Sequence, residues 1–179
     1  FIQSGYRPVA HVEMNGYAAK TLETRIAYYY LKDNGELNSY YDYEKGKITR
    51  TQLLEKIPEE ELKTVINKEM SESTIKGIFN TIDEIKKEKG IENIDVIIGG
   101  PPCQAYSLVG RAQSSHMVVP MEDDPRNELY KMYVQFLNKY KPRMFVFENV
   151  AGIKSARGGQ AFKNLQMYMK RVGYEICYD

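Results

Sequence analysis

Cys103 is the residue of this chain whose type and setting point most directly to chemistry. It lies in the run Pro-Pro-Cys-Gln at 101–104, directly after the apolar stretch Asp-Val-Ile-Ile-Gly-Gly at 95–100. That stretch predicts a strand buried on both faces, and open α/β sheets bind ligands just beyond such strand ends. The two prolines fix φ, so ordering the loop costs little entropy. A lone cysteine is commonly a small core residue, but this setting favours a reactive thiol.

Glu148 is the second candidate, because it ends another short apolar run, Met-Phe-Val-Phe at 144–147. The separation of roughly 45 residues from Cys103 leaves room for a loop, a helix and the return strand of one right-handed βαβ crossover. The two strand ends would then share one edge of the sheet. A carboxylate after a strand is often a helix cap or a solvated charge. Next to a thiol, Glu148 becomes a candidate acid.

The residues around these two positions resemble the cytosine-5 methyltransferase family. The runs Pro-Pro-Cys-Gln at 101–104 and Glu-Asn-Val at 148–150 are similar to its nucleophile loop and acid motif, and Ala-Tyr-Ser at 105–107 continues the loop. Between them, Asp-Pro-Arg-Asn at 124–127, followed by Leu129, resembles the block that the family carries there. These matches are specific, and they tie both candidate residues to one reaction.

The resemblance is looser toward the start of the chain. Residues 1–6 resemble the end of the family's first motif, and Val-Glu-Met-Asn at 12–15 its second motif. The most specific stretch is about 95–153, while 35–90 is poorly covered.

This resemblance implies a chemistry that explains the residue types. Carbon 5 of cytosine is a poor nucleophile, so the Cys103 thiolate would add to carbon 6 and push electron density onto carbon 5. A protonated Glu148 at ring nitrogen 3 would neutralise the charge that develops there. Desolvation by Phe145, Phe147 and the flipped base would raise the pKa of Glu148 and keep it protonated. Neither group reaches a base stacked in a duplex, so the cytosine of double-stranded DNA would be flipped into a pocket.

The methyl donor implied is S-adenosyl-L-methionine. An acidic residue at the end of the second strand of such a sheet binds ribose hydroxyls, and the resemblance adds two residues of the adenosyl pocket. The implied cofactor-binding residues are Glu13, Pro102 and Leu129. A further family position, where an acidic residue often contacts adenine, falls near Lys47 by sequence and is left unassigned.

Candidate DNA contacts surround the thiol and the block after it. Two polar residues of the nucleophile loop would hold the DNA backbone or fill the gap left by the flipped base, and two basic residues would suit phosphates. These candidates are Gln104, Ser107, Arg111 and Arg126. The net charge of +1 is low for a protein that grips a polyanion by itself.

Composition indicates a globular chain without a metal or disulfide framework. The 179 residues are 42% hydrophobic and 27% charged, which suits one domain with a sizeable core. The two cysteines form no CxxC pair or Cys/His cluster, so no metal site is predicted, and Cys177 is expected to have a structural role in a strand. No run approaches the roughly 20 apolar residues of a membrane span. We expect a cytoplasmic bacterial protein.

Strands and helices are predicted to alternate along the chain. Apolar runs predict strands at 8–12, 95–100, 144–150 and from 174. Helical spacing and capping residues predict helices at 15–31, 49–56, 58–69, 73–89, 127–140 and 160–172. Residues 36–48 are predicted to be a loop with little order, and 103–125 a loop as long as an active-site lid.

With the resemblance, these elements imply an α/β chain, part of a Rossmann-like S-adenosylmethionine-dependent methyltransferase fold with a helical insertion at about 36–90. A stabilising flap is the simplest role for the insertion. The family's glycine-rich turn would precede residue 1, and its Gln-x-Arg-x-Arg block and target-recognition domain would follow residue 179. We therefore expect 1–179 to be a partial catalytic domain that is inactive alone.

Three functions remain open at this point. The first is a DNA cytosine-5 methyltransferase of a restriction-modification system, with a paired restriction endonuclease as a candidate partner. The second is an RNA cytosine-5 methyltransferase, which would carry the same Cys103 and Glu148. The third is a non-catalytic scaffold or partner subunit that retains the fold, although such a protein has no chemical need for either residue.

Overall fold

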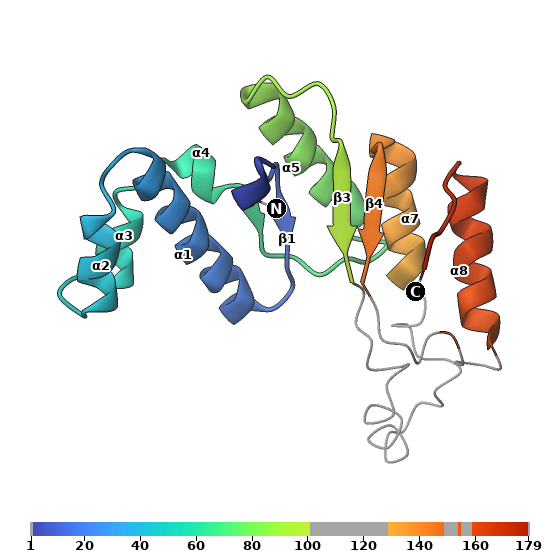
Figure 1. The fold of residues 1–179 in the computed structure, drawn as a ribbon, viewed down its shortest axis with the longest axis horizontal. Coiled ribbons are helices and arrows are strands. Elements are labelled where there is room, and N and C mark those ends of the chain that lie inside the picture. The colour runs from blue at the N-terminus through green and yellow to red at the C-terminus, as the bar shows by residue number, and fades with distance from the viewer. Residues whose placement is uncertain (1, 101–128, 149–153, 155–158, 179) are drawn as a thin grey trace, which may run out of the picture. The chain divides into compact units, whose positions relative to one another are not determined.

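The computed structural model of the chain describes residues 2–100, 129–148, 154 and 159–178 (Figure 1). The chain divides into two compact units, Phe1–Glu92 and Asn93–Asp179. Each unit combines helices with one two-stranded parallel sheet, so the architecture is α/β. A larger, doubly wound Rossmann-like sheet stays a prediction.

The first unit is organised around two short parallel strands, β1 (His11–Val12) and β2 (Val65–Ile66). Backbone bonds continue the pairing on both sides of the strands, from His11 N to Thr64 O (2.7 Å) and from Glu13 N to Ile66 O (3.1 Å). A strand predicted over 8–12 is therefore confirmed at its last two residues. Glu13 is held at the carboxyl end of this sheet.

Helix α1 (Gly16–Asp33) follows β1 directly, as predicted. It begins where Asn15 caps it, because Asn15 Oδ1 accepts hydrogen bonds from Tyr17 N (2.9 Å) and Ala18 N (3.1 Å). The cap satisfies two backbone donors that have no partner within the helix. A short 3-10 helix, Ile2–Ser4, precedes β1.

Two short helices follow, α2 (Asn38–Glu44) and α3 (Arg50–Leu54). Thr49 and Gln52 form a capping box that begins α3, in agreement with the helix predicted at 49–56. The prediction of little order over 36–48 is wrong, because α2 lies there. Tyr40 and Tyr43 of α2 pack against a buried cluster of Ala27, Leu31, Leu53 and Ile57. A tyrosine ring buries apolar area although the residue counts as polar in sequence.

The helix predicted over 58–69 is wrong over its second half. Helix α4 (Glu59–Leu62) ends after one turn, and Val65 and Ile66 form β2 instead. Both residues are β-branched, which lowers helix propensity and favours a strand. Pairing with β1 then decides the conformation. The stretch between α1 and α5 (Ile75–Glu88) therefore contains a strand of the sheet as well as helices.

Helix α5 confirms the helix predicted at 73–89. Its buried residues are isoleucines spaced by three or four positions, which places them on one face of the helix. They are Ile75, Ile78, Ile82 and Ile85.

The second unit pairs β3 (Val96–Gly99) with β4 (Met144–Phe147), which run parallel and in register. Helix α7 (Leu129–Tyr140) packs against β3 and against α8 (Gln160–Arg171). All four elements lie where the sequence predicts them. Their buried core consists of Tyr133, Val134, Leu137, Leu165 and Met169.

The two faces of the β3–β4 sheet differ. Ile97, Phe145 and Phe147 pack against the core under α7 and α8. Side chains alternate along a strand, and Ile98 and Met144 on the other face are 49% and 47% exposed. The expectation that the strand before Cys103 is buried on both faces is therefore wrong for this sheet, which the helices cover on one face.

The end of the chain contacts the core through side chains. Residues 174–178 form no strand, so the strand predicted from 174 is wrong over the described residues. Tyr174 packs edge-to-face on Phe145, and its hydroxyl donates to Pro142 O (2.6 Å). Cys177 is exposed there, outside the strand expected for it.

Two further findings concern only the described residues. None of their helices is long and apolar enough to cross a bilayer. No three His, Cys, Asp or Glu side chains among them are grouped so as to hold a metal ion. The cytoplasmic location stays a prediction.

Candidate active site

The carboxyl ends of β3 and β4 lie side by side in the second unit. The strands are parallel, with Gly99 opposite Phe147, and Glu148 N donates a hydrogen bond to Gly99 O (2.9 Å). Glu148 therefore follows β4 at the same edge where the chain leaves β3 toward Cys103. The sequence prediction that both strand ends share one edge is confirmed. The Glu148 side chain is exposed at this edge.

Gly100 contacts Glu148 so closely that no larger residue fits without a shift. A Cβ atom on Gly100 would lie 2.6 Å from Glu148 Oε2 and 2.8 Å from the Glu148 carbonyl oxygen. Both distances are shorter than real Cβ contacts. Moving the carboxylate would relieve the first contact, but only a backbone shift relieves the second. The absence of a side chain at Gly100 thus allows Glu148 to lie this close to the end of β3.

Glu148 is the predicted acid, and for a catalytic role of this residue we expect Gly100→Ala to lower the reaction rate. A displacement near 1 Å at a catalytic group costs on the order of 10²-fold in rate. The measurement is the single-turnover rate of the full-length protein on its substrate. Gly77→Ala, on helix α5, is the matched control. A Cβ atom on Gly77 would meet only Lys68 Nζ, at 3.9 Å. A Gly100→Ala enzyme as fast as the control would contradict the inferred constraint.

The aromatic residues before Glu148 do not shield it as expected. Phe145 and Phe147 face the core, where both contact the ring of Tyr133 edge-on, with centroids 6.1 Å and 5.1 Å away. The alternation of side chains explains the error, because residues one and three positions before Glu148 share the face covered by α7.

Most of the other predicted site residues lie outside the described residues. These are Pro102, Cys103, Gln104, Ser107, Arg111 and Arg126. Leu129 is the first residue of α7. Their predicted roles in catalysis, cofactor binding and DNA binding stay predictions.

A second group of polar residues follows the strands of the first unit. Glu13 comes directly after β1, as predicted, and its Oε1 accepts a hydrogen bond from Asn15 N (2.8 Å). Asn67 comes directly after β2, and its Nδ2 donates to Glu13 O (2.7 Å) and Met14 O (3.2 Å). Glu13 and Asn67 are thus brought together at the carboxyl ends of two parallel strands.

The sequence does not predict Asn67 as a site residue, and it leaves the family's adenine contact, near Lys47, unassigned. In the structure Lys47 lies in the turn between α2 and α3, where it forms an ion pair with Asp42 (2.9 Å). The run Thr-Val-Ile-Asn at 64–67 is β-branched and ends in an amide residue, which is compatible with a strand and a turn after it. A strand of two residues is too short to show the alternation that would identify it from sequence.

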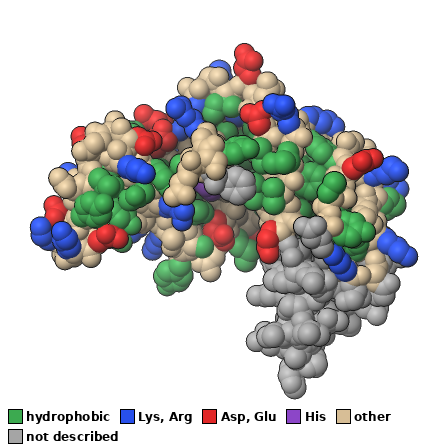
Figure 2. Space-filling model, viewed as in Figure 1, with side chains coloured by type: hydrophobic (Ala, Val, Ile, Leu, Met, Phe, Trp, Pro, Cys, Tyr) green, Lys and Arg blue, Asp and Glu red, His purple; other side chains and the backbone are tan. Residues whose placement is uncertain are grey.

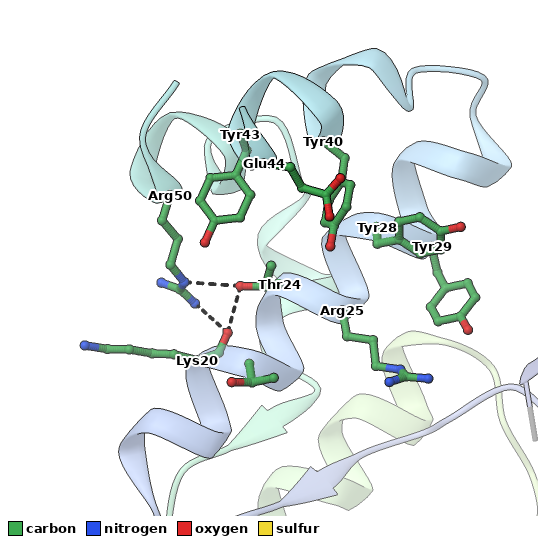
Figure 3. Close-up of a pocket in the computed structure, with 10 residues that line it drawn as sticks. Lys20, Thr24, Arg25, Tyr28, Tyr29, Tyr40, Tyr43, Glu44 and Arg50 are labelled. Carbon is green, nitrogen blue, oxygen red and sulfur yellow. Dashed lines mark hydrogen bonds between the residues drawn. The ribbon is translucent and has the colours of Figure 1, made fainter. Parts of the chain in front are cut away.

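A cavity of about 620 Å³ opens between α1, α2 and α3 in the first unit (Figure 3). Its basic residues already have protein partners. Arg50 donates to Thr24 Oγ1 (3.3 Å) and Lys20 O (3.1 Å) and pairs with Glu23. Arg25 lies over the ring of Tyr29. None of the predicted site residues lines this cavity, and its bonds tie α3 to α1.

Charge gives little support to strong nucleic-acid binding by the face of the molecule shown in Figure 2. Basic and acidic side chains are interspersed on the face shown in Figure 2. Burial, and then the nearby charge of Arg25, hold the pKa of His11 below its ordinary value, which favours a neutral imidazole near pH 7. Phosphate contacts on this face would come from single basic side chains rather than from a continuous basic patch.

Comparisons with known proteins agree on the family of this site. A model of the C-5 cytosine-specific DNA methylase family matches residues 55–179. Type II methyltransferase M.Bpa9945I of Bacillus paralicheniformis is 32% identical over 98% of the chain and 43% of its own length. Type II methyltransferase M.XorII of Xanthomonas oryzae is 37% identical over 55% of the chain and 22% of its own length. Type II methyltransferase M.DdeI of Desulfomicrobium norvegicum is 35% identical over 59% of the chain and 24% of its own length. The chain thus spans less than half of each of these relatives.

Proposed function

The chain belongs to the family of C-5 cytosine-specific DNA methylases, and from this premise we propose that it carries the catalytic residues of a DNA cytosine-5 methyltransferase. In this proposal the full-length protein transfers a methyl group from S-adenosyl-L-methionine to carbon 5 of a flipped cytosine, through a covalent adduct with Cys103. The observation that carries the proposal is the parallel register of β3 and β4, with Glu148 N bonded to Gly99 O at 2.9 Å.

Cys103 is the proposed nucleophile. Its thiolate forms a bond to carbon 6 of cytosine, and the electron pair of the 5,6 double bond moves toward carbon 5. That electron pair would form the bond from carbon 5 to the methyl group, while the bond between the methyl group and the sulfonium sulfur of the donor breaks and the sulfur leaves as a neutral thioether. Loss of the carbon 5 proton to a base returns the electron pair to the ring and expels the thiolate. The nucleophile is regenerated, and no oxidant or reductant is consumed.

Glu148 is the proposed acid. Addition of the thiolate places negative charge on the ring, and a proton held by Glu148 at ring nitrogen 3 neutralises it. Glu148 N bonds to Gly99 O, and Glu148 lies so close to Gly100 that no side chain fits there. Gly100 lies three residues before Cys103 in the sequence. This support for the geometry comes from strands rather than from loops alone, which favours a fixed distance between acid and nucleophile.

S-adenosyl-L-methionine would supply an electrophilic methyl group, and the polar residues at the end of β1 fit its ribose. The carboxylate of Glu13 is oriented by the bond from Asn15 N to Oε1, and we propose that Oε2 accepts from a ribose hydroxyl. Asn67 fixes the backbone of this turn through its bonds to Glu13 O and Met14 O. By resemblance to the family, Pro102 and Leu129 would line the adenosyl pocket.

We also propose that loop residues around Cys103 hold the DNA. Gln104 and Ser107 would contact the backbone near the flipped base, and Arg111 and Arg126 would contact phosphates. Because several similar proteins are named type II methyltransferases, we propose a restriction endonuclease of the same specificity as a functional partner.

The test of the proposed function is methylation by the full-length protein. After incubation with S-adenosyl-L-methionine and double-stranded DNA, nucleoside analysis should detect 5-methylcytosine in the DNA. The same assay with RNA separates the alternative substrate, since 5-methylcytosine in RNA alone would overturn the proposal. Methylation of neither polymer, by protein that binds DNA, would favour the non-catalytic scaffold.

A further inference from the structure

Tyr133 is a buried residue of α7 that bonds to both strands of the candidate site. Its hydroxyl lies 3.1 Å from Ile97 O on β3 and 3.0 Å from Val146 O on β4. The phenol has one proton, which it donates between these two carbonyls. Val146 lies two residues before Glu148, and Ile97 lies two residues before Gly99. The hydroxyl therefore joins the two strands just before the edge where their ends meet.

The ring of Tyr133 fits a gap that only glycine leaves. A Cβ atom on Gly99 would lie 2.7 Å from Tyr133 Cε2 and 3.1 Å from Cδ2. On its other side the ring meets Phe147 edge-on, at 5.1 Å between centroids and 83° between planes. Gly99 and Phe147 face each other in the strand register. The ring is thus seated over the last residue pair of the sheet.

The environment keeps this hydroxyl a donor. Tyr133 is 4% exposed, and burial raises the pKa of its phenol well above the ordinary value. The phenol is therefore protonated at neutral pH, where it donates to the two carbonyls.

We propose that Tyr133 is a positioning residue for the methyl transfer reaction, because it fixes the spacing between the strand that leads to Cys103 and the strand that ends at Glu148. The inference rests on the proposed function. In this proposal Tyr133 acts through the backbone carbonyls of Ile97 and Val146 and through its close approach to Gly99. Removing its hydroxyl leaves the strands paired but relaxes the distance between their ends, and misplacement of that kind lowers rates more than it lowers binding.

Tyr174 offers a matched control in the same unit. Its hydroxyl also donates to a backbone carbonyl, Pro142 O at 2.6 Å, and its ring packs on Phe145. Pro142 precedes β4, so this bond lies at the end of the strand remote from Glu148. Tyr174→Phe and Tyr133→Phe thus each remove one tyrosine hydroxyl bonded to backbone in this unit, and they differ in which end of β4 is affected.

The experiment compares the two variants in the full-length protein, with saturating DNA and S-adenosyl-L-methionine. We expect both to lower the melting temperature by a few degrees. Tyr133→Phe alone should lower the single-turnover rate of methyl transfer, on the order of tenfold, with the Kd for DNA changed by less than about twofold. Gly99→Ala, which keeps the hydroxyl but displaces the ring, should lower the rate in the same way.

Equal rates for the two tyrosine variants would overturn the positioning role and leave Tyr133 with a purely structural one. A Gly99→Ala protein that is folded by circular dichroism and reacts at the wild-type rate would overturn it as well. Absence of 5-methylcytosine with the wild-type protein would instead overturn the proposed function, and the inference with it.

Discussion

Replacing Cys103 by Ser is expected to abolish the covalent adduct between the full-length protein and DNA that carries 5-fluorocytosine. In the proposed reaction, with S-adenosyl-L-methionine present, the Cys103 thiolate adds to carbon 6 and carbon 5 is methylated. Fluorine then occupies the place of the proton that must leave, so the thiolate cannot be expelled and the adduct accumulates. A serine hydroxyl at this position is a much weaker nucleophile than a thiolate. The adduct is measured as a band of reduced mobility that resists denaturation.

Cys177→Ser is the control for this experiment. It removes the other cysteine of the chain, which is exposed in the second unit and therefore open to adventitious reaction. We expect this variant to form the adduct at the wild-type rate. An adduct that persists in Cys103→Ser and disappears in Cys177→Ser would reverse the assignment of the nucleophile.

Glu148→Gln is expected to lower the single-turnover rate of methyl transfer by about 10² to 10⁴, the usual contribution of a positioned acid or base. Glutamine has nearly the same shape and still donates a hydrogen bond, but it has no proton to transfer to ring nitrogen 3. The Kd for DNA should therefore change much less than the rate. The rate is measured with enzyme in excess over DNA, so that product release does not limit it.

Glu175→Gln makes the same chemical change at another exposed glutamate of the second unit and should leave the rate unchanged. Normal turnover of Glu148→Gln would return Glu148 to a structural role at the end of β4. Equal losses in rate and in DNA affinity would indicate that Glu148 holds the base rather than protonating it.

The position of Glu148 beside the carboxyl end of β3 could be predicted because the sequence pattern that indicates it is local. Two short apolar runs, each followed by a break and separated by a helix, have essentially one arrangement in an α/β protein, a right-handed parallel crossover. The helix between them, α7, and the two strands were accordingly predicted near their observed bounds. The roles of Cys103 and Glu148 came from the family resemblance and from the chemistry that it implies.

The pairing of β2 with β1 could not be predicted because its signal is not local. Val65 and Ile66 follow a helical turn rich in glutamate, and two residues are too few to show the alternation of a strand. Only the hydrogen bonds to β1, far away in sequence, make them a strand. Asn67 was missed for the same reason, since its place at the sheet end follows from that pairing.

The close contacts of Gly99 and Gly100 lie beyond sequence patterns altogether. In sequence the two glycines indicate only that a backbone or ligand approaches. Gly99 accommodates the ring of Tyr133, and this contact depends on how α7 is rotated over the sheet. Gly100 accommodates the backbone of Glu148, and this contact depends on the course of β4. Such complementarity is a property of packed tertiary structure.

The pairing of β1 with β2 also bears on how freely the segment between them can change in length. The entropy of closing a flexible loop grows only with the logarithm of its length, so each doubling costs about 0.6 kcal/mol. Here the intervening helices have their own core around Leu31 and Leu53, and the ion pair between Arg50 and Glu23 joins α3 to α1. Local contacts thus hold most of the segment between the strands in place, in addition to the pairing of β1 with β2. Residues added or removed at the turns between these helices would therefore leave the end of β1, where Glu13 lies, almost undisturbed.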